Sequence, residues 1–188
     1  MSNRKPIVLA SASPRRQELL RNAGIEFVVR SAGIPEVPFA GEQPRKFAER
    51  MSIEKARTMR IGSEVILAAD TVVAVDGEIL GKPQSTKDAF RMLRLLSDRT
   101  HEVITAVCLL GEGFEDVRSE RTKVHFNPMS EAEIATYVAS GEPMDKAGAY
   151  AIQGGASRWI SKLEGDYQNV VGLPVDLVRK MLEEHRAF

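Results

Sequence analysis

A short apolar run that passes directly into helix-starting residues is the feature that most constrains this chain. Residues 7–9 read Ile-Val-Leu, and residues 10–16 read Ala-Ser-Ala-Ser-Pro-Arg-Arg. Ser13 is a favourable N-cap residue, and Pro14 suits the first position of a helix, where its missing N–H costs no hydrogen bond. The stretch therefore predicts a buried strand that is followed within a few residues by a helix.

The same stretch can also bind an anion. The N-terminus of a helix carries unpaired N–H groups and the positive end of the helix dipole, and both favour phosphate. Arg15 and Arg16 add planar sets of hydrogen-bond donors that match phosphate oxygens. Helix capping by Ser13, with two solvated arginines, explains these residues equally well, so both interpretations stay open at this point.

Strand and helix patterns alternate along the rest of the chain, which indicates an α/β fold with a mixed, partly antiparallel sheet. Asp76 and Gly77 separate two apolar runs and predict a type I′ hairpin. Residues 144–172 are rich in glycine, so we expect an irregular segment there, which can mark a second lobe and a cleft. The expected strands cover residues 6–10, 27–29, 64–75, 78–80, 101–110 and 115–126, and the expected helices cover residues 14–23, 44–60, 86–97, 130–140 and 174–185.

The charge balance argues against some classes of partner. Lys plus Arg and Asp plus Glu each number 26, which gives a formal net charge of zero. Extended nucleic-acid or anionic membrane surfaces normally need an excess of basic residues, whereas a small phosphorylated ligand needs only a local basic cluster. The sequence has no signal-peptide pattern and no apolar run long enough to span a membrane. We therefore expect a cytoplasmic protein that binds neither nucleic acid nor membrane.

Two charged residues in unusual surroundings are candidates for chemistry. Asp70 lies within an apolar strand pattern, where a carboxylate is costly unless it is paired or binds a metal. It can serve as a metal ligand or as a general base, or it can simply be hydrogen-bonded at a sheet edge. Lys82 stands between Gly81 and Pro83, which indicates either a lysine aimed at phosphate or a solvated turn.

A third cluster lies at residues 145–155. Its glycines serve turns, or they form a nucleotide pocket together with Gln153, whose amide both donates and accepts hydrogen bonds. Glu36 and Lys55 are weaker candidates, because such residues more often lie on the surface. The sequence contains no P-loop, no dinucleotide-binding glycine pattern and no zinc-ligand spacing.

Taken together, these motifs resemble the Maf family of nucleoside triphosphate pyrophosphatases, and the likeness runs nearly from end to end. Several spaced motifs in the right order are far more specific than any one of them. The matching segments are residues 10–16, 18–20, 36, 55–56, 69–73, 81–83, 101–103, 105, 141–142, 145–150, 152–154 and 167–174.

The resemblance implies a fold and a reaction. The fold would be a mixed, twisted sheet flanked by helices, with two lobes around a central cleft in a single domain over residues 1–188. The reaction would be hydrolysis between the α and β phosphates, with a divalent cation such as Mg²⁺ or Mn²⁺, to a nucleoside monophosphate and pyrophosphate. The sequence of residues 145–154 is similar to the branch that acts on dTTP and UTP. A homodimer is implied by the family alone.

The resemblance also implies roles for single residues. In the pyrimidine branch, the positions that match Arg15, Thr71 and Gln153 are associated with substrate choice, and the position that matches Asp70 with proton acceptance. Family members usually have glycine where this chain has Ala151, which bears on how Gln153 is placed. A nucleotide-binding regulator of septum formation, in which hydrolysis is incidental, is the alternative. The resulting hypothesis makes Asp70, Lys82 and Arg16 catalytic, makes Ser11, Ser13, Arg15, Lys55, Thr71 and Gln153 substrate-binding, and makes Glu36 and Asp70 the ligands of the cation.

Overall fold

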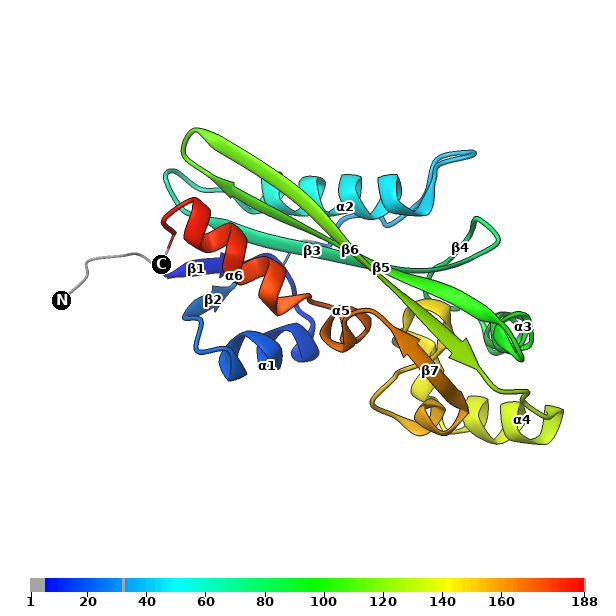
Figure 1. Ribbon diagram of the computed structural model, residues 1–188. Coiled ribbons are helices and arrows are strands. Elements are labelled where there is room, and N and C mark those ends of the chain that lie inside the picture. The colour runs from blue at the N-terminus through cyan, green and yellow to red at the C-terminus, as the bar shows by residue number, and fades with distance from the viewer. Residues whose placement is uncertain (1–5, 32, 188) are drawn as a thin grey trace.

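A mixed β-sheet forms the centre of the molecule (Figure 1). The computed structural model describes residues 6–31 and 33–187. Within these residues, seven strands form one sheet. Along the sheet the order of neighbours is β2 (Phe27–Val29), β1 (Ile7–Leu9), β3 (Ile66–Val75), β5 (Thr100–Gly111), β6 (Phe114–Phe126) and β7 (Ile160–Glu164). The remaining strand, β4 (Glu78–Leu80), also pairs with β3.

The strand directions confirm the predicted mixed α/β sheet. The pairs β1–β2 and β1–β3 are parallel, and the pairs from β3 onward to β7 are antiparallel. The turn between β3 and β4 has positive φ angles at Asp76 (51°) and Gly77 (81°). A type I′ turn requires this combination, so the hairpin predicted from the Asp-Gly pair is confirmed.

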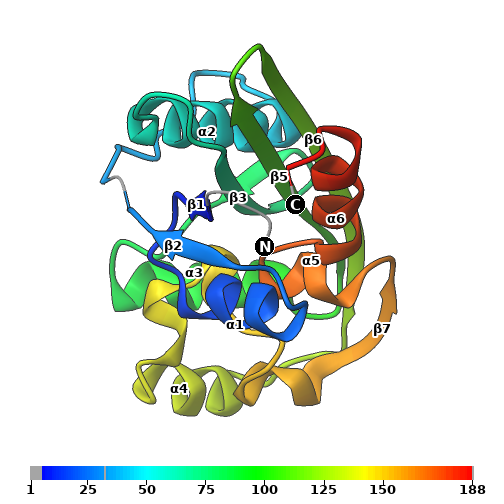
Figure 2. The same ribbon diagram turned by 90° about the vertical axis from the view of Figure 1, so that its left-hand side faces the viewer.

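Helices cover both faces of the sheet, and Figures 1 and 2 show α2 on the side opposite to α1. Because side chains alternate along a strand, β3 supplies both cores: Leu67 and Ala69 pack beneath α1 and α6, while Ile66 and Ala68 pack beneath α2. One face carries α2 (Pro44–Met59). The other face carries α1 (Pro14–Asn22), α5 (Tyr167–Val171) and α6 (Val175–Glu184). At one end of the sheet, α3 (Thr86–Leu96) packs against α4 (Glu131–Ala139).

The segment over residues 144–172 is more regular than its glycines predict, so the expectation of an irregular segment is wrong for β7 and α5. In β7 the apolar Ile160 and Leu163 do not alternate, and its pairing with β6 shifts register between His125 and Phe126. The period-two signal is therefore absent. α5 is only five residues long, too short to form without tertiary contacts. The segment also includes the 3₁₀ helices η1 (Glu142–Asp145), η2 (Ala147–Ala149) and η3 (Gly155–Trp159).

The edge of β3 is open at its middle, and this gap determines where the site lies. β1 pairs with β3 only as far as Leu9 opposite Leu67, and β4 begins its pairing with Leu80 opposite Val73. Among the described strands, none therefore pairs with residues 68–72 on this edge. Unpaired backbone groups of a strand are available to side chains and ligands.

One glycine closes the structure beside this gap. Gly148 has a φ of 68°, and a Cβ atom there would lie 2.8 Å from a side-chain atom of Val73. Its N–H donates to the carbonyl of Gly81 at 3.1 Å. Only glycine allows both the left-handed conformation and this close approach, so the residues around η2 lie directly against β3.

In the described part of the chain, no helix combines the length and the apolar character that a membrane crossing requires.

Candidate active site

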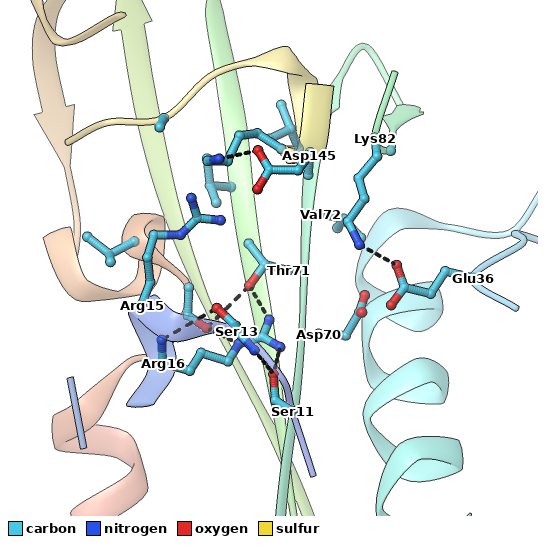
Figure 3. Close-up of a pocket in the computed structure, with 18 of the residues that line it drawn as sticks. Ser11, Ser13, Arg15, Arg16, Glu36, Asp70, Thr71, Val72, Lys82 and Asp145 are labelled. Atoms are coloured by element: carbon cyan, nitrogen blue, oxygen red, sulfur yellow. Dashed lines mark hydrogen bonds and ion pairs between the residues drawn. The ribbon is translucent and has the colours of Figure 1, made fainter. Parts of the chain in front are cut away.

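A cleft of ≈ 1180 Å³ runs along the open edge of β3 (Figure 3). Its walls come from the start of α1, the loop before α2, the connection between β4 and α3, and residues 145–153. The cleft brings together every residue that the sequence singled out for binding or catalysis. These are Ser11, Ser13, Arg15, Arg16, Glu36, Lys55, Asp70, Thr71, Lys82 and Gln153.

Arg16 is held on one side of β3 by neutral groups only. Its Nε donates to the carbonyl of Gly172 at 2.8 Å, and its Nη1 donates to the carbonyl of Ala69 at 2.8 Å and to Ser11 Oγ at 3.2 Å. Its Nη2 donates to Thr71 Oγ1 at 3.0 Å. The Ala69 carbonyl belongs to the unpaired edge of β3, so Arg16 takes the place of a strand partner there. Among the residues that the structure describes, no carboxylate directly contacts its positive charge.

A buried network behind Thr71 supports this arginine. The hydroxyls of Thr71 and Thr105 are 2.9 Å apart, and Thr105 Oγ1 donates to the carbonyl of Asn169 at 2.9 Å. The side chain of Asn169 accepts from the N–H of Thr105 at 3.1 Å and donates to the carbonyl of Val103 at 3.0 Å. Asn169 thereby fixes α5 to β5, and the residue that follows α5 is Gly172, the acceptor of Arg16.

The first turn of α1 separates its two arginines. Ser13 is the N-cap residue, and its Oγ accepts from the N–H of Arg16 at 3.5 Å, which confirms the predicted capping. Within residues 6–31 and 33–187, the side chain of Arg15 makes no hydrogen bond or ion pair. Figure 3 shows it extending toward the segment that carries Asp145. The pKa of Asp145 lies below its ordinary value, chiefly because Lys146 donates to it, and Arg15 adds to this effect.

The acidic side of the site lies on the opposite face of β3. Asp70 is adjacent to Thr71 in the strand, so its side chain points to the α2 side. Lys55 Nζ, from α2, lies 2.5 Å from Asp70 Oδ1 and 2.7 Å from Glu36 Oε1. Lys82 Nζ lies 3.7 Å from Glu36 Oε2. The buried ammonium of Lys55 therefore contacts two carboxylates. The ammonium of Lys82 approaches Glu36 from the rim of the cleft (Figure 3).

The environment shifts the pKa values of these groups in different directions. Burial raises the pKa of Asp70 above its ordinary value, and Lys55 offsets this only in part. Burial also acts to raise the pKa of Glu36, but Lys55 and Lys82 outweigh it and hold that pKa below the ordinary value. Burial lowers the pKa of Arg16, against the attraction of Asp70 and Glu36. Asp70 is thus the carboxylate better suited to accept a proton.

The two carboxylates suit a hard divalent cation. Asp70 and Glu36 both direct an oxygen at one positively charged nitrogen, that of Lys55. Mg²⁺ prefers oxygen ligands, and it is often held by one or two carboxylates together with substrate phosphates and water. Among the described residues, no group of three or more His, Cys, Asp or Glu could hold a metal ion. Asp70 and Glu36 can therefore supply two of the oxygen ligands that a hard divalent cation prefers.

Gln153 lies on the far wall of the cleft, in a turn closed by a hydrogen bond of 3.1 Å from the N–H of Gly154 to the carbonyl of Ala151. Its side chain is exposed and makes no hydrogen bond within the described part of the chain. Ala151 does not have a positive φ, so alanine fits this backbone without strain.

Sequence reasoning missed three residues that support the site. Asn169 belonged to a matching motif without a role of its own, and a polar residue beside Val170 and Val171 was the available signal. Tyr137 and Glu142 contact the Gln153 turn from outside the cleft. Glu142 belonged to the matching segment 141–142 without a role of its own, and no local pattern distinguished Tyr137 from an ordinary helix residue.

Comparisons with known proteins identify related sequences and a related fold. The family model described as Maf-like protein matches residues 6–185. The chain is 51% identical over 178 residues to the dTTP/UTP pyrophosphatase of Koribacter versatilis, covering 94% of this chain and 92% of that one. It is 52% identical to the dTTP/UTP pyrophosphatase of Syntrophomonas wolfei, covering 93% and 94%. The structure of the Staphylococcus aureus Ham1 protein has a similar fold, with a TM-score of 0.52 at 15% identity, over 96% of this chain and 100% of that one.

Proposed function

Because the chain belongs to the family of Maf-like proteins, we propose that it hydrolyses dTTP and UTP to the nucleoside monophosphate and pyrophosphate. One observation carries this proposal: a single cleft has the half-buried guanidinium of Arg16 on one side of β3 and two carboxylates, Asp70 and Glu36, on the other. Hydrolysis of a nucleoside triphosphate needs positive charge against the phosphates and a base for water.

Arg16 binds the triphosphate. A guanidinium has five N–H donors, and the four hydrogen bonds of Arg16 to neutral acceptors leave one N–H and the whole charge for an anion. Because those bonds fix the planar group before substrate arrives, little side-chain entropy is lost on binding. Arg15 and Lys82 line the same cleft and supply further positive charge near its rim.

Asp70 accepts the proton of the attacking water. Burial gives this carboxylate a raised pKa, which makes it a stronger base than an ordinary aspartate. Lys55 fixes its position through the contact of 2.5 Å. The oxygen of this water forms a bond to phosphorus as the phosphorus–oxygen bond of the bridge between the α and β phosphates breaks. Arg16 and Lys82 stabilise the negative charge that develops on the departing pyrophosphate.

Asp70 and Glu36 are the residues that would hold a divalent cation. When bound, such a cation supplies charge neutralisation of the phosphates and makes water more acidic. Lys55, which contacts both carboxylates, keeps them together before substrate binds. Without it, two negative groups would repel each other in a partly buried site.

Gln153 reads the pyrimidine base. Its amide has one acceptor and two donors, which matches the mixed donor and acceptor edge of thymine or uracil. Thr71 affects substrate choice through the hydroxyl that holds Arg16. Arg15, without a protein partner in the described residues, is free to contact the ligand between its base and its phosphates.

A product assay tests the proposal. The purified protein is incubated with dTTP, UTP, dCTP, dATP and dGTP, with and without Mg²⁺, and pyrophosphate and phosphate are measured separately. We expect equal amounts of pyrophosphate and monophosphate, with dTTP and UTP the preferred substrates. Release of inorganic phosphate in place of pyrophosphate would contradict the reaction. Tight nucleotide binding without turnover would instead support a binding regulator.

A further inference from the structure

Tyr137 and Glu142 form a hydrogen-bonded unit that holds the Gln153 turn at both of its ends. The Tyr137 hydroxyl donates to Glu142 Oε1 at 2.7 Å and accepts from the N–H of Ala151 at 3.3 Å. The N–H of Gly155 donates to both oxygens of Glu142 at 3.1 Å. One side-chain pair therefore binds the backbone at the first residue of the turn and at the residue immediately after its last.

Gly154 shows how closely this unit approaches the turn. A Cβ atom on Gly154 would lie 1.8 Å from Glu142 Oε1, although its φ of −109° is open to any residue. The position thus requires glycine because of the carboxylate and not because of the backbone conformation. A Cβ atom on Gly155 would lie 3.3 Å from the ring of Tyr137, which is also close.

The unit itself lies outside the cleft, whose lining includes Gln153 but neither Tyr137 nor Glu142. Tyr137 is buried, and its ring packs against Trp159 edge-on at 5.2 Å. A side chain that cannot contact the ligand can influence it only through the residues it holds. In this case those residues are the turn and, on it, Gln153.

We infer that the Tyr137–Glu142 pair is a positioning unit for Gln153 that sets how well the enzyme distinguishes pyrimidine bases; this rests on the proposed function. Thymine and uracil present an acceptor at position 4 and a donor at position 3, whereas cytosine presents the reverse. Gln153 distinguishes these patterns when its amide oxygen meets the donor at position 3 and its NH₂ group meets the acceptor at position 4. Whether both atoms reach the base at hydrogen-bond distance depends on the backbone position of the turn.

The experiment measures kcat and KM for dTTP and dCTP in single variants of the full-length protein. Tyr137→Phe keeps the packing on Trp159 and removes only the hydroxyl. We expect it to lower the ratio of kcat/KM for dTTP to kcat/KM for dCTP by about two- to tenfold, which corresponds to the net free energy of one hydrogen bond. The change is expected mainly in KM, because the acidic side of the cleft is untouched.

Glu142 gives a pair of variants that separates positioning from general structural support. Glu142→Ala removes the acceptor of Gly155 and is expected to lower the ratio at least as much as Tyr137→Phe. Glu142→Gln retains one oxygen in place and is expected to restore most of it. Amide hydrogen exchange at Gly155 is expected to be faster in Glu142→Ala than in Glu142→Gln. Tyr167→Phe, which removes an exposed hydroxyl, is the matched control and is expected to leave the ratio unchanged.

Gly154 supplies a second test that does not depend on removing the unit. Gly154→Ala is expected to displace the Glu142 carboxylate and lower the ratio. In the Glu142→Ala background the same substitution meets no carboxylate, so we expect no further loss; such non-additivity is typical of residues in contact. Additive losses would overturn the inference.

The outcomes distinguish this inference from the proposed function. If the wild-type protein releases no pyrophosphate from dTTP, the proposed function itself fails. If the wild-type protein prefers dTTP and Gln153→Ala removes that preference, but Tyr137→Phe and Glu142→Ala both retain it, only the positioning inference is overturned.

Discussion

Asp70 and Thr71 are neighbours in one strand, yet they belong to two electrostatically different regions of the cleft. On the Thr71 side, the cation of Arg16 is held by carbonyl and hydroxyl oxygens. On the Asp70 side, carboxylates are held by the ammonium of Lys55. The first region keeps an uncompensated positive charge, and the second compensates two negative charges with one buried cation.

This difference shows how a single strand can divide two tasks. Successive residues of a strand point to opposite faces, so a one-residue step separates Thr71, which holds the proposed phosphate-binding Arg16, from Asp70, the proposed base for water. The gap between β1 and β4 leaves both faces accessible at the same edge. Binding should therefore depend mainly on the Arg16 side, and turnover mainly on the Asp70 side.

Asp70→Asn gives the largest expected effect. It keeps the size and an acceptor for Lys55 but removes the proton acceptor, so we expect kcat to fall by about 10²- to 10⁴-fold, the usual contribution of a general base. KM should change far less. Steady-state kinetics with dTTP is the measurement, and Asp176→Asn, an exposed residue on α6, is the control. A variant that retains wild-type kcat would remove Asp70 from this role.

Arg16→Lys is expected to have the next largest effect. A lysine cannot make the planar set of bonds to Ala69, Gly172 and Thr71 at once. We expect KM for dTTP to rise by about 10- to 100-fold, as for the loss of a charged hydrogen bond. Arg21→Lys on the same helix, whose guanidinium contacts only Gln17 by hydrogen bond among the described residues, is the control. An equal rise in both variants would contradict the distinction between the two positions.

Asn169→Ala is expected to act on the Arg16 side alone and more weakly. It leaves the N–H of Thr105 and the carbonyl of Val103 without their side-chain partner, at a cost of about 1–3 kcal/mol for each unpaired group. Denaturant unfolding should show this loss of stability, and kinetics should show a smaller rise in KM than Arg16→Lys causes. Asn127→Ala, at an exposed position, is the comparison. A fall in kcat with an unchanged KM would contradict the account.

Much of the fold could be predicted because its signals are local. The N-cap at Ser13, the Asp76–Gly77 hairpin and the capping box at Ser130 each depend on a few adjacent residues. β7 and α5 could not be predicted in this way. The register shift between β6 and β7 and the burial of Asn169, a residue of α5, are tertiary features.

The residues that line the candidate site could be named from the sequence, but their arrangement could not. Asp70 was recognisable as a carboxylate in an apolar strand, and Gln153 by its place among glycines. In contrast, the bond from Arg16 to Gly172 joins residues 156 positions apart, and the approach of Glu142 to Gly154 depends on how η1 packs beside the turn. Such contacts leave no periodic or compositional trace in the sequence.

The most direct test of the division between the two sides is the affinity for dTTP, measured by calorimetry in the presence of EDTA. The account predicts that Asp70→Asn binds dTTP at least as tightly as the wild-type protein, because a negative charge near the phosphates is removed. It predicts that Arg16→Lys binds about tenfold more weakly or worse. Weak binding by Asp70→Asn together with wild-type affinity in Arg16→Lys would contradict it.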